Sequence, residues 1–302
     1  MRDVPDFKGF ARIEPVDKGW SGDKKYFVCT NDGRHLLLRV APAAEYERKK
    51  AEFEMMGRVA ALGVPMSQPV DFGRCCEGES VYQLLTWCEG EDAEDALPRL
   101  AQDAQYALGA ESGRILRKIH AIPAPEGQED WAARFNRKTD VKIEKYRACG
   151  IRFDGDTQMI AYVEANRHLL QNRPQCYQHG DYHVGNMIVG GDGSLSIIDF
   201  NRNDFGDPWE EFNRIVWSAQ AAPAFATGQL DGYFGGRLPE WFFGLLAFYI
   251  SSNMLSSIYW AQPFGQDEVD TMLRQSQDVR EWFDDMANPV PSWYRVYGRN
   301  EG

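Results

Sequence analysis

The spacing of hydrophobic residues predicts that the chain begins with a small β-sheet. Two short apolar runs, at 26–29 and 35–40, flank Asn31-Asp32-Gly33, a sequence that favours a tight turn. Together they predict a β-hairpin, and a third apolar run at 81–87 predicts a further strand. We therefore expect the stretch 1–90 to be rich in β-structure.

One helix interrupts these strands. Residues 45–62 place apolar side chains three and four positions apart, which is typical of an amphipathic helix, and Gly63 and Pro65 end it. The polar, turn-like segment 89–92 then indicates a boundary. We place an N-lobe at residues 1–88 and a C-lobe at residues 89–302.

The C-lobe is expected to be mainly helical. One helix carries an apolar face from Leu108 to Ile119, and a further helix is predicted over 157–171. The segment 241–261 has about the length of a membrane-spanning helix. It contains Asn253 and four serines, so we interpret it as a buried helix of a helical lobe.

Composition and charge argue against several classes of protein. The 302 residues are 43% hydrophobic and 26% charged, which is typical of a globular protein and excludes a disordered or fibrous chain. The formal net charge of −12 argues against a nucleic-acid binder, because phosphate contacts need Lys and Arg. The acidic surplus suits a cationic small molecule, although surface acidity by itself usually serves only solubility. The six cysteines contain no CxxC pair, and the first residues lack the apolar core of a signal peptide, so we expect a cytoplasmic protein with buried free thiols and no membrane partner.

A second hairpin is predicted where polar residues cluster. Apolar runs at 186–189 and 195–198 flank a glycine-rich turn, and Asp181, Asn186 and Asp199 lie at its open end. Because a hairpin brings its ends together, we expect these side chains to converge. Asp and Asn oxygens suit Mg²⁺, and a carboxylate free of the metal can receive a proton from an attacking hydroxyl. Phosphoryl transfer from a nucleotide needs such a set of groups.

The residues around this hairpin resemble a known enzyme family. HGDYHVGN (179–186), IIDF (197–200) and GDPWEE (206–211) occur in order and resemble the catalytic signature of the aminoglycoside phosphotransferase and choline kinase superfamily. The resemblance implies an α+β, bilobal protein-kinase-like fold, with a small β-sheet N-lobe carrying one helix and a larger, mainly helical C-lobe. It also implies a small-molecule kinase that uses Mg²⁺ and moves the γ-phosphoryl group of ATP or GTP to a hydroxyl.

The same resemblance implies roles for individual residues. Asp181 would be the catalytic base or would orient the hydroxyl, and Asn186 and Asp199 would hold Mg²⁺ at the nucleotide phosphates. His179 and Asp207 would support the catalytic loop. The spacing of His179 and His183 also permits a zinc pair, but zinc needs further ligands and the surrounding glycines indicate a loop.

The phosphate clamp departs from the family pattern. The family has a lysine on the third strand that pairs with a helical glutamate, whereas this chain has Arg39 at that position and Glu52 on the helix. Arginine binds phosphate but is not interchangeable with lysine, so Lys24 and Lys25 remain alternative candidates. This departure also leaves open the alternative that the chain is a module that binds a nucleotide without transferring its phosphoryl group.

The resemblance places the remaining nucleotide contacts at two loops. Ser21 lies in the segment 19–24, which would cover the phosphates, and Trp87 and Cys88 lie at the hinge that would receive the adenine.

The acceptor is left open among aminoglycosides, other hydroxylated antibiotics, sugars and amino alcohols. Trp260 with Asp267 and Glu268 forms a candidate pocket for a cationic acceptor, because aromatic faces and carboxylates attract ammonium groups, but these acids also fit a solvated helix start. Only 200–206 separate Asp199 from Asp207, which leaves little room for the activation segment of a protein kinase.

Overall fold

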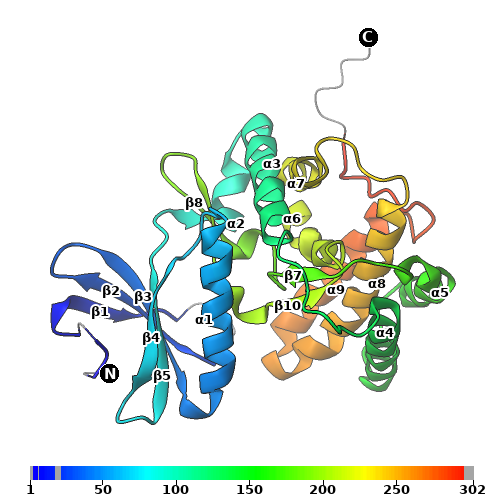
Figure 1. Ribbon diagram of the computed structural model, residues 1–302. Coiled ribbons are helices and arrows are strands. Elements are labelled where there is room, and N and C mark those ends of the chain that lie inside the picture. Colours follow the sequence, from blue (N-terminus) through cyan, green and yellow to red (C-terminus); the bar gives the residue numbers. More distant parts are fainter. Residues whose placement is uncertain (1–2, 6, 18–21, 296–302) are drawn as a thin grey trace. The chain divides into compact units, whose positions relative to one another are not determined.

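The computed structural model describes residues 3–5, 7–17 and 22–295, and the chain divides into two compact units (Figure 1). The first unit is formed by Met1–Ala93 with Asn186–Asn203, and the second by Glu94–Gly185 with Asp204–Gly302. The second hairpin thus belongs to the first unit, whereas the sequence-based boundary after residue 88 assigned it to the C-lobe. Backbone hydrogen bonds explain this, since the Ile197 N–H donates to the Pro65 carbonyl at 2.9 Å.

A five-stranded antiparallel sheet with the strand order β1-β2-β3-β5-β4 forms most of the first unit. The predicted hairpin is β2–β3, with Gly33 in the left-handed conformation at its turn. The edge strands β1 and β4 were not predicted, because their exposed and buried positions do not alternate regularly. The bounds are β1 Phe10–Pro15, β2 Lys24–Thr30, β3 His35–Pro42, β4 Pro69–Cys75 and β5 Ser80–Thr86.

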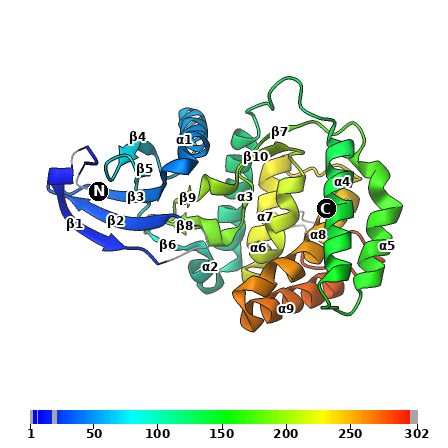
Figure 2. The same cartoon turned by 90° about the horizontal axis from the view of Figure 1, so that it is seen from below.

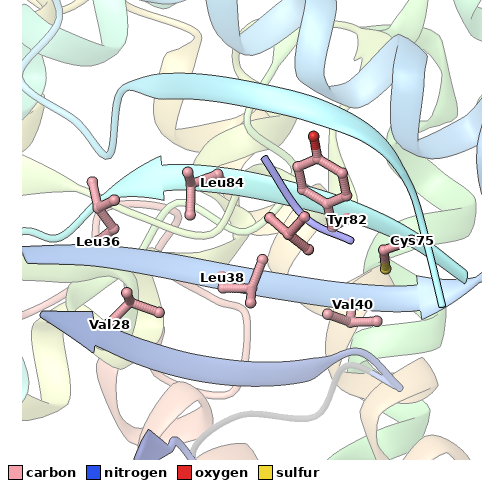
Figure 3. Close-up of a cluster of buried hydrophobic side chains, with 8 residues drawn as sticks. Val28, Leu36, Leu38, Val40, Cys75, Tyr82 and Leu84 are labelled. Carbon is pink, nitrogen blue, oxygen red and sulfur yellow. The ribbon is translucent and has the colours of Figure 1, made fainter. Parts of the chain in front are cut away.

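The two faces of this sheet differ in chemistry. Alternate residues of β3, namely Leu36, Leu38 and Val40, point to one face and pack in a buried apolar cluster with side chains of neighbouring strands (Figure 3). Arg39 lies between them in sequence and therefore points to the opposite face, toward Gln83 of β5 and the predicted helix, α1 (Tyr46–Ala61). One strand thus supplies both an apolar core and a buried charge.

The first unit also contains a three-stranded sheet with the order β6-β8-β9. The strands β8 and β9 form the second predicted hairpin, whose existence is confirmed. The strands of this sheet are β6 Glu91–Asp92, β8 Met187–Val189 and β9 Leu195–Ile197. The first unit also has the 3-10 helices η1 Phe7–Gly9, η2 Ala43–Glu45 and η6 Phe200–Arg202.

Helices make up most of the second unit, as expected, and β7 (Cys176–Gln178) pairs with β10 (Asp204–Gly206) beside them. The helix predicted over 157–171 is α5 followed by a 3-10 turn, and α4 was not predicted. The helices are α2 Ala93–Ala96, α3 Gln102–Ile119, α4 Trp131–Ala148, α5 Asp156–Asn166, α6 Ile215–Ala221, α7 Pro223–Phe234, α8 Phe242–Ala261 and α9 Gln266–Trp282, with 3-10 turns η3 Leu97–Arg99, η4 Arg167–Leu170, η5 Val184–Asn186, η7 Glu210–Arg214 and η8 Gln262–Phe264.

The most apolar helix, α8, is the core of the second unit. The stretch Phe242–Phe264 could cross a membrane by length and composition, but 83% of its apolar window is buried inside the protein. The helices α4 and α5 both pack against α8 (Figure 2). The expectation of a buried helix is therefore confirmed.

A close crossing of α3 and α7 depends on glycines from both helices. A Cβ atom at Gly113 would lie 2.1 Å from the Gln229 carbonyl oxygen, and one at Gly228 would lie 2.2 Å from the Tyr106 oxygen. These separations are shorter than van der Waals contact, so the two backbones approach to a distance that only glycine permits.

All six cysteines are free thiols. Cys75 and Cys176 are buried and the other four are partly exposed, so the expectation of buried thiols is correct for two of the six.

Candidate active site

The hairpin β8–β9 brings two of the predicted metal ligands together in the first unit. Asn186 directly precedes β8, and its carbonyl accepts a hydrogen bond from the Ile198 N–H at 3.0 Å, so it lies opposite the residue before Asp199. Asp199 has a left-handed backbone conformation with φ 63° and ψ 65°. This conformation costs free energy in a residue other than glycine and is often kept at functional sites.

The carboxylate of Asp199 has one paired and one unpaired oxygen. Oδ2 lies 3.5 Å from Nζ of Lys25. Oδ1 is buried without a hydrogen-bond partner among the described residues, and Nη1 of Arg39 lies 3.9 Å from it. Because an unpaired buried oxygen costs free energy, this atom is suited to coordinate a cation, and with Asn186 it offers the oxygen ligands that Mg²⁺ prefers.

Arg39 is held between two carboxylates. Its Nη1 donates to Oε1 of Glu52 at 3.0 Å, which is the pair that the family pattern implied. Its Nε and Nη2 both donate to Oδ2 of Asp23, at 3.1 and 2.7 Å. The Arg39 side chain is only 3% exposed. Burial opposes the charge, but Glu52, Asp199 and Asp23 outweigh it and raise the pKa of Arg39.

A second buried cation completes this network. Nζ of Lys49, on α1, lies 2.5 Å from Oδ2 of Asp23 and 3.4 Å from Oε2 of Glu52. Burial works against the carboxylate of Asp23, yet Arg39 and Lys49 hold its pKa below the usual value. Sequence reasoning missed Asp23 and Lys49, although the spacing of three between Lys49 and Glu52 places both on one face of the helix.

The predicted catalytic residue, Asp181, belongs to the second unit. Its Oδ1 lies 3.3 Å from Nε of Arg214 and 3.6 Å from Nε2 of His183. The Asp181 side chain is 18% exposed, so it is accessible to a small molecule. Sequence reasoning did not single out Arg214, which follows the GDPWEE segment by three residues.

Side chains of His179, His183 and Glu211 hold the backbone of the catalytic loop. The fully buried His179 accepts a hydrogen bond from the Asp181 N–H at 3.3 Å, and His183 accepts one from the Gly185 N–H at 3.1 Å. The Gly180 N–H donates to Oε1 of Glu211 at 2.9 Å. Within the described ranges, no group of three or more His, Cys, Asp or Glu side chains could hold a metal, so nothing supports the zinc alternative. Glu211 was missed, although it ends the GDPWEE segment.

Asp207 is completely buried and fully hydrogen-bonded. Its two oxygens accept from Nε and Nη2 of Arg173 at 2.6 and 2.7 Å. The Tyr249 hydroxyl donates to Oδ2 at 2.6 Å, and the Trp209 N–H donates to Oδ1 at 2.9 Å. The carboxylate thus joins α8 to the segments before β7 and after β10 in the second unit, and this arrangement supports the structural role expected for Asp207.

Two of the expected nucleotide contacts of the first unit, Trp87 and Cys88, follow the end of β5. Ser21 lies outside the described residues. Trp87 directly follows β5, its N–H donates to the His35 carbonyl at 3.1 Å, and its ring packs edge-on against Phe27. Cys88 is partly buried, and burial raises the pKa of its thiol.

The expected substrate residues lie near the start of α9. Asp267 and Glu268 are in the first turn of α9, where carboxylates favour the helix dipole without any ligand. The Trp260 ring packs against the ring of Phe264 with centroids 4.8 Å apart. This local geometry is accounted for by helix stability and apolar contact, and it adds no support for a cation pocket.

The chain shares sequence similarity with phosphotransferases. The family described as "Phosphotransferase enzyme family" matches residues 12–243. A curated aminoglycoside 3'-phosphotransferase from Niallia circulans is 22% identical over 209 residues, which cover 66% of this chain and 76% of the relative.

Solved structures share the fold. An amicoumacin kinase in complex with AMP-PNP, Ca²⁺ and Ami has a TM-score of 0.65 at 14% identity, covering 94% of this chain and 91% of that one. Wild-type aminoglycoside 2'-phosphotransferase-IIIa in its GDP complex has a TM-score of 0.65 at 13% identity, covering 91% and 94%. The expected α+β, protein-kinase-like fold is confirmed by these similarities.

Proposed function

Because the chain belongs to the phosphotransferase enzyme family, we propose that it transfers the γ-phosphoryl group of ATP or GTP to a hydroxyl group of a small molecule. Family membership confirms the resemblance drawn from the catalytic segment and the expectation of a small-molecule kinase. The observation that carries the specific reaction is the end of the hairpin β8–β9, where Asn186 and the unpaired Oδ1 of Asp199 lie together.

The first unit is proposed to hold the nucleotide. Asn186 and Asp199 would hold Mg²⁺, which when bound neutralises phosphate charge. The neighbouring amicoumacin kinase and aminoglycoside 2'-phosphotransferase-IIIa are nucleotide complexes, which supports ATP or GTP as the co-substrate here. Trp87 and Cys88 would offer backbone groups to the base, and Ser21 would contact the phosphates.

Asp181 is proposed to orient the acceptor hydroxyl and to receive its proton. A carboxylate within hydrogen-bond reach of a hydroxyl raises its nucleophilicity when the proton begins to leave. Arg214, whose Nε lies 3.3 Å from Oδ1, would attract this carboxylate as an ion-pair partner. The hydrogen bonds of His179 and Glu211 to the loop backbone hold Asp181 in place, which matters because a small displacement of such a group costs rate steeply.

The acceptor is proposed to be a hydroxylated antibiotic, with aminoglycosides first. The curated relative is named an aminoglycoside phosphotransferase, and one related structure is a complex with ADP and hygromycin B. A kinase acting on a sugar or an amino alcohol is the alternative acceptor class. The net charge of −12 is compatible with a polycationic acceptor but is not evidence for one.

A coupled ADP-release screen tests this function. The wild-type protein is assayed with Mg-ATP and Mg-GTP over aminoglycosides, macrolides, choline-like amines and sugars. We expect acceptor-dependent release that D181A abolishes, while nucleotide binding by D181A is retained. The control D154N changes a carboxylate that is 99% exposed and should transfer like the wild type. Nucleotide binding without transfer to any acceptor would favour a binding module instead, and normal transfer by D181A would refute the role of Asp181.

A further inference from the structure

Arg39 occupies the family position of the phosphate-binding lysine, but each of its three nitrogens already donates to a buried carboxylate. Nε, Nη1 and Nη2 all donate to the carboxylates of Asp23 and Glu52, and the side chain is 3% exposed. Turning this guanidinium toward a phosphate would leave two buried carboxylates short of a cation, which is strongly unfavourable. Arg39 is therefore built into the unit as a structural charge.

The Asp23–Arg39–Lys49–Glu52 network is balanced without any ligand. Two cations face two anions, and all four side chains are at most 4% exposed. The network therefore has no surplus positive charge to offer a triphosphate. The triphosphate and the Asp199 carboxylate together carry more negative charge than one Mg²⁺ would neutralise, so a further cation beside Asp199 would lower their repulsion.

Lys25 lies where such a cation is needed. It is directly opposite Arg39 in the pairing of β2 with β3, so both side chains share one face of the sheet. Its Nζ lies 3.5 Å from Oδ2 of Asp199, and its side chain is 12% exposed against 3% for Arg39. The neighbouring Lys24 points to the other face of the strand, because successive side chains alternate.

We propose that Lys25 of β2, and not Arg39 of β3, supplies the cation that contacts the nucleotide phosphates next to Asp199. This inference rests on the proposed phosphotransferase function. A lysine ammonium suits the task because it is compact, has three donors and sits on a flexible stem, so it can touch Asp199 and a phosphate oxygen together. Arg39 then acts as a positioning residue that holds β3 to α1 through Glu52.

The test compares K25M, K25R and the matched control K24M in the full chain. Removing one charged donor from a phosphoryl-transfer site lowers turnover by about 100-fold or more, so we expect that loss in kcat/KM for ATP with K25M. ADP affinity by isothermal titration, with and without Mg²⁺, should fall about tenfold, the equivalent of one charge-assisted hydrogen bond. K25R should restore most of the affinity, and K24M should match the wild type.

Arg39→Lys provides the complementary measurement. Because Arg39 is structural in this proposal, R39K should lower the melting temperature while ADP affinity at low temperature stays within about threefold of wild type, a difference of less than one hydrogen bond. K25M should instead lower the ADP affinity and leave the melting temperature of the free protein unchanged.

Two results separate this inference from the proposed function. If the wild type transfers no phosphoryl group but binds ADP, the proposed function fails, and Lys25 is still tested by the ADP affinity of K25M. If K25M keeps wild-type ADP affinity, or if R39K loses affinity as strongly as K25M was expected to, the assignment of the phosphate contact to Lys25 is overturned.

Discussion

Replacing Asp207 by asparagine removes the charge of a buried ion pair and keeps the side-chain shape. The partner, Arg173, is 6% exposed and would be left as an uncompensated buried cation. Breaking one side of such a pair costs about 3–5 kcal/mol of unfolding free energy. At about 2–4 °C of melting temperature per kcal/mol, the expected fall for D207N is about 6–20 °C.

Circular dichroism during heating, repeated in urea, measures this loss. Glu129→Gln is the matched control, because Arg137 also binds Glu129 through two parallel hydrogen bonds of 2.7 Å, but there the side chains are 64% and 43% exposed. Solvent screens that exposed pair, so E129Q should melt close to the wild type. The double variant R173M/D207N removes the uncompensated cation as well and should recover part of the loss.

Equal melting temperatures for D207N and E129Q would refute the reasoning, since the two pairs differ chiefly in burial. A double variant that is less stable than D207N would also contradict it, because the penalty would then come from lost packing and not from the unpaired charge.

Three further predictions follow from other parts of the chain. D199N should remove the Mg²⁺ dependence of nucleotide affinity measured by titration calorimetry, and an unchanged Mg²⁺ effect would exclude this carboxylate as a ligand. G113A should lower the free energy of unfolding, measured in urea, by about 1–3 kcal/mol, because its Cβ would overlap the Gln229 carbonyl oxygen. G57A on α1, where a Cβ would meet nothing within 4 Å, should raise it slightly, and equal effects would contradict the close crossing. Burial, together with Lys138 and Arg214, lowers the pKa of Lys142 from 10.5 to about 7. Between these two pH values the unfolded chain binds this proton and the folded chain does not, so the stability of the folded state rises with pH. In melting curves, K142M should therefore exceed the wild type in stability by the largest amount below pH 7, and this difference should shrink by pH 9. A difference in stability that stays constant with pH would refute the pKa shift.

Local sequence patterns were sufficient for the elements with regular periodicity. The hairpin β2–β3, the helix α1 and the buried helix α8 all follow from side-chain spacing and turn residues within a few positions of each other. The edge strands β1 and β4 were missed, because their buried positions do not alternate regularly. The helix α4 was also missed, although its buried residues recur at helical spacing and could have been found.

The candidate site was predictable where its residues form contiguous motifs. Asp181, Asn186 and Asp199 stand out because the segments around them occur in a family-like order, and the hairpin was expected to bring all three together. Asp23 and Lys49 were not predictable in this way, since each is an ordinary charged residue until the sheet and α1 bury it beside Arg39.

The sequence by itself thus determined the family, the fold class and the residues that mark the catalytic loop, because these depend on local order and spacing. Only the tertiary structure decided how two such cations are paired. Arg39 and Lys25 are both positive residues on neighbouring strands, and the difference between them is that Asp23 and Glu52 surround one while the other faces Asp199. Charge is set by the residue type, but its availability is set by burial and by partners brought from distant parts of the chain.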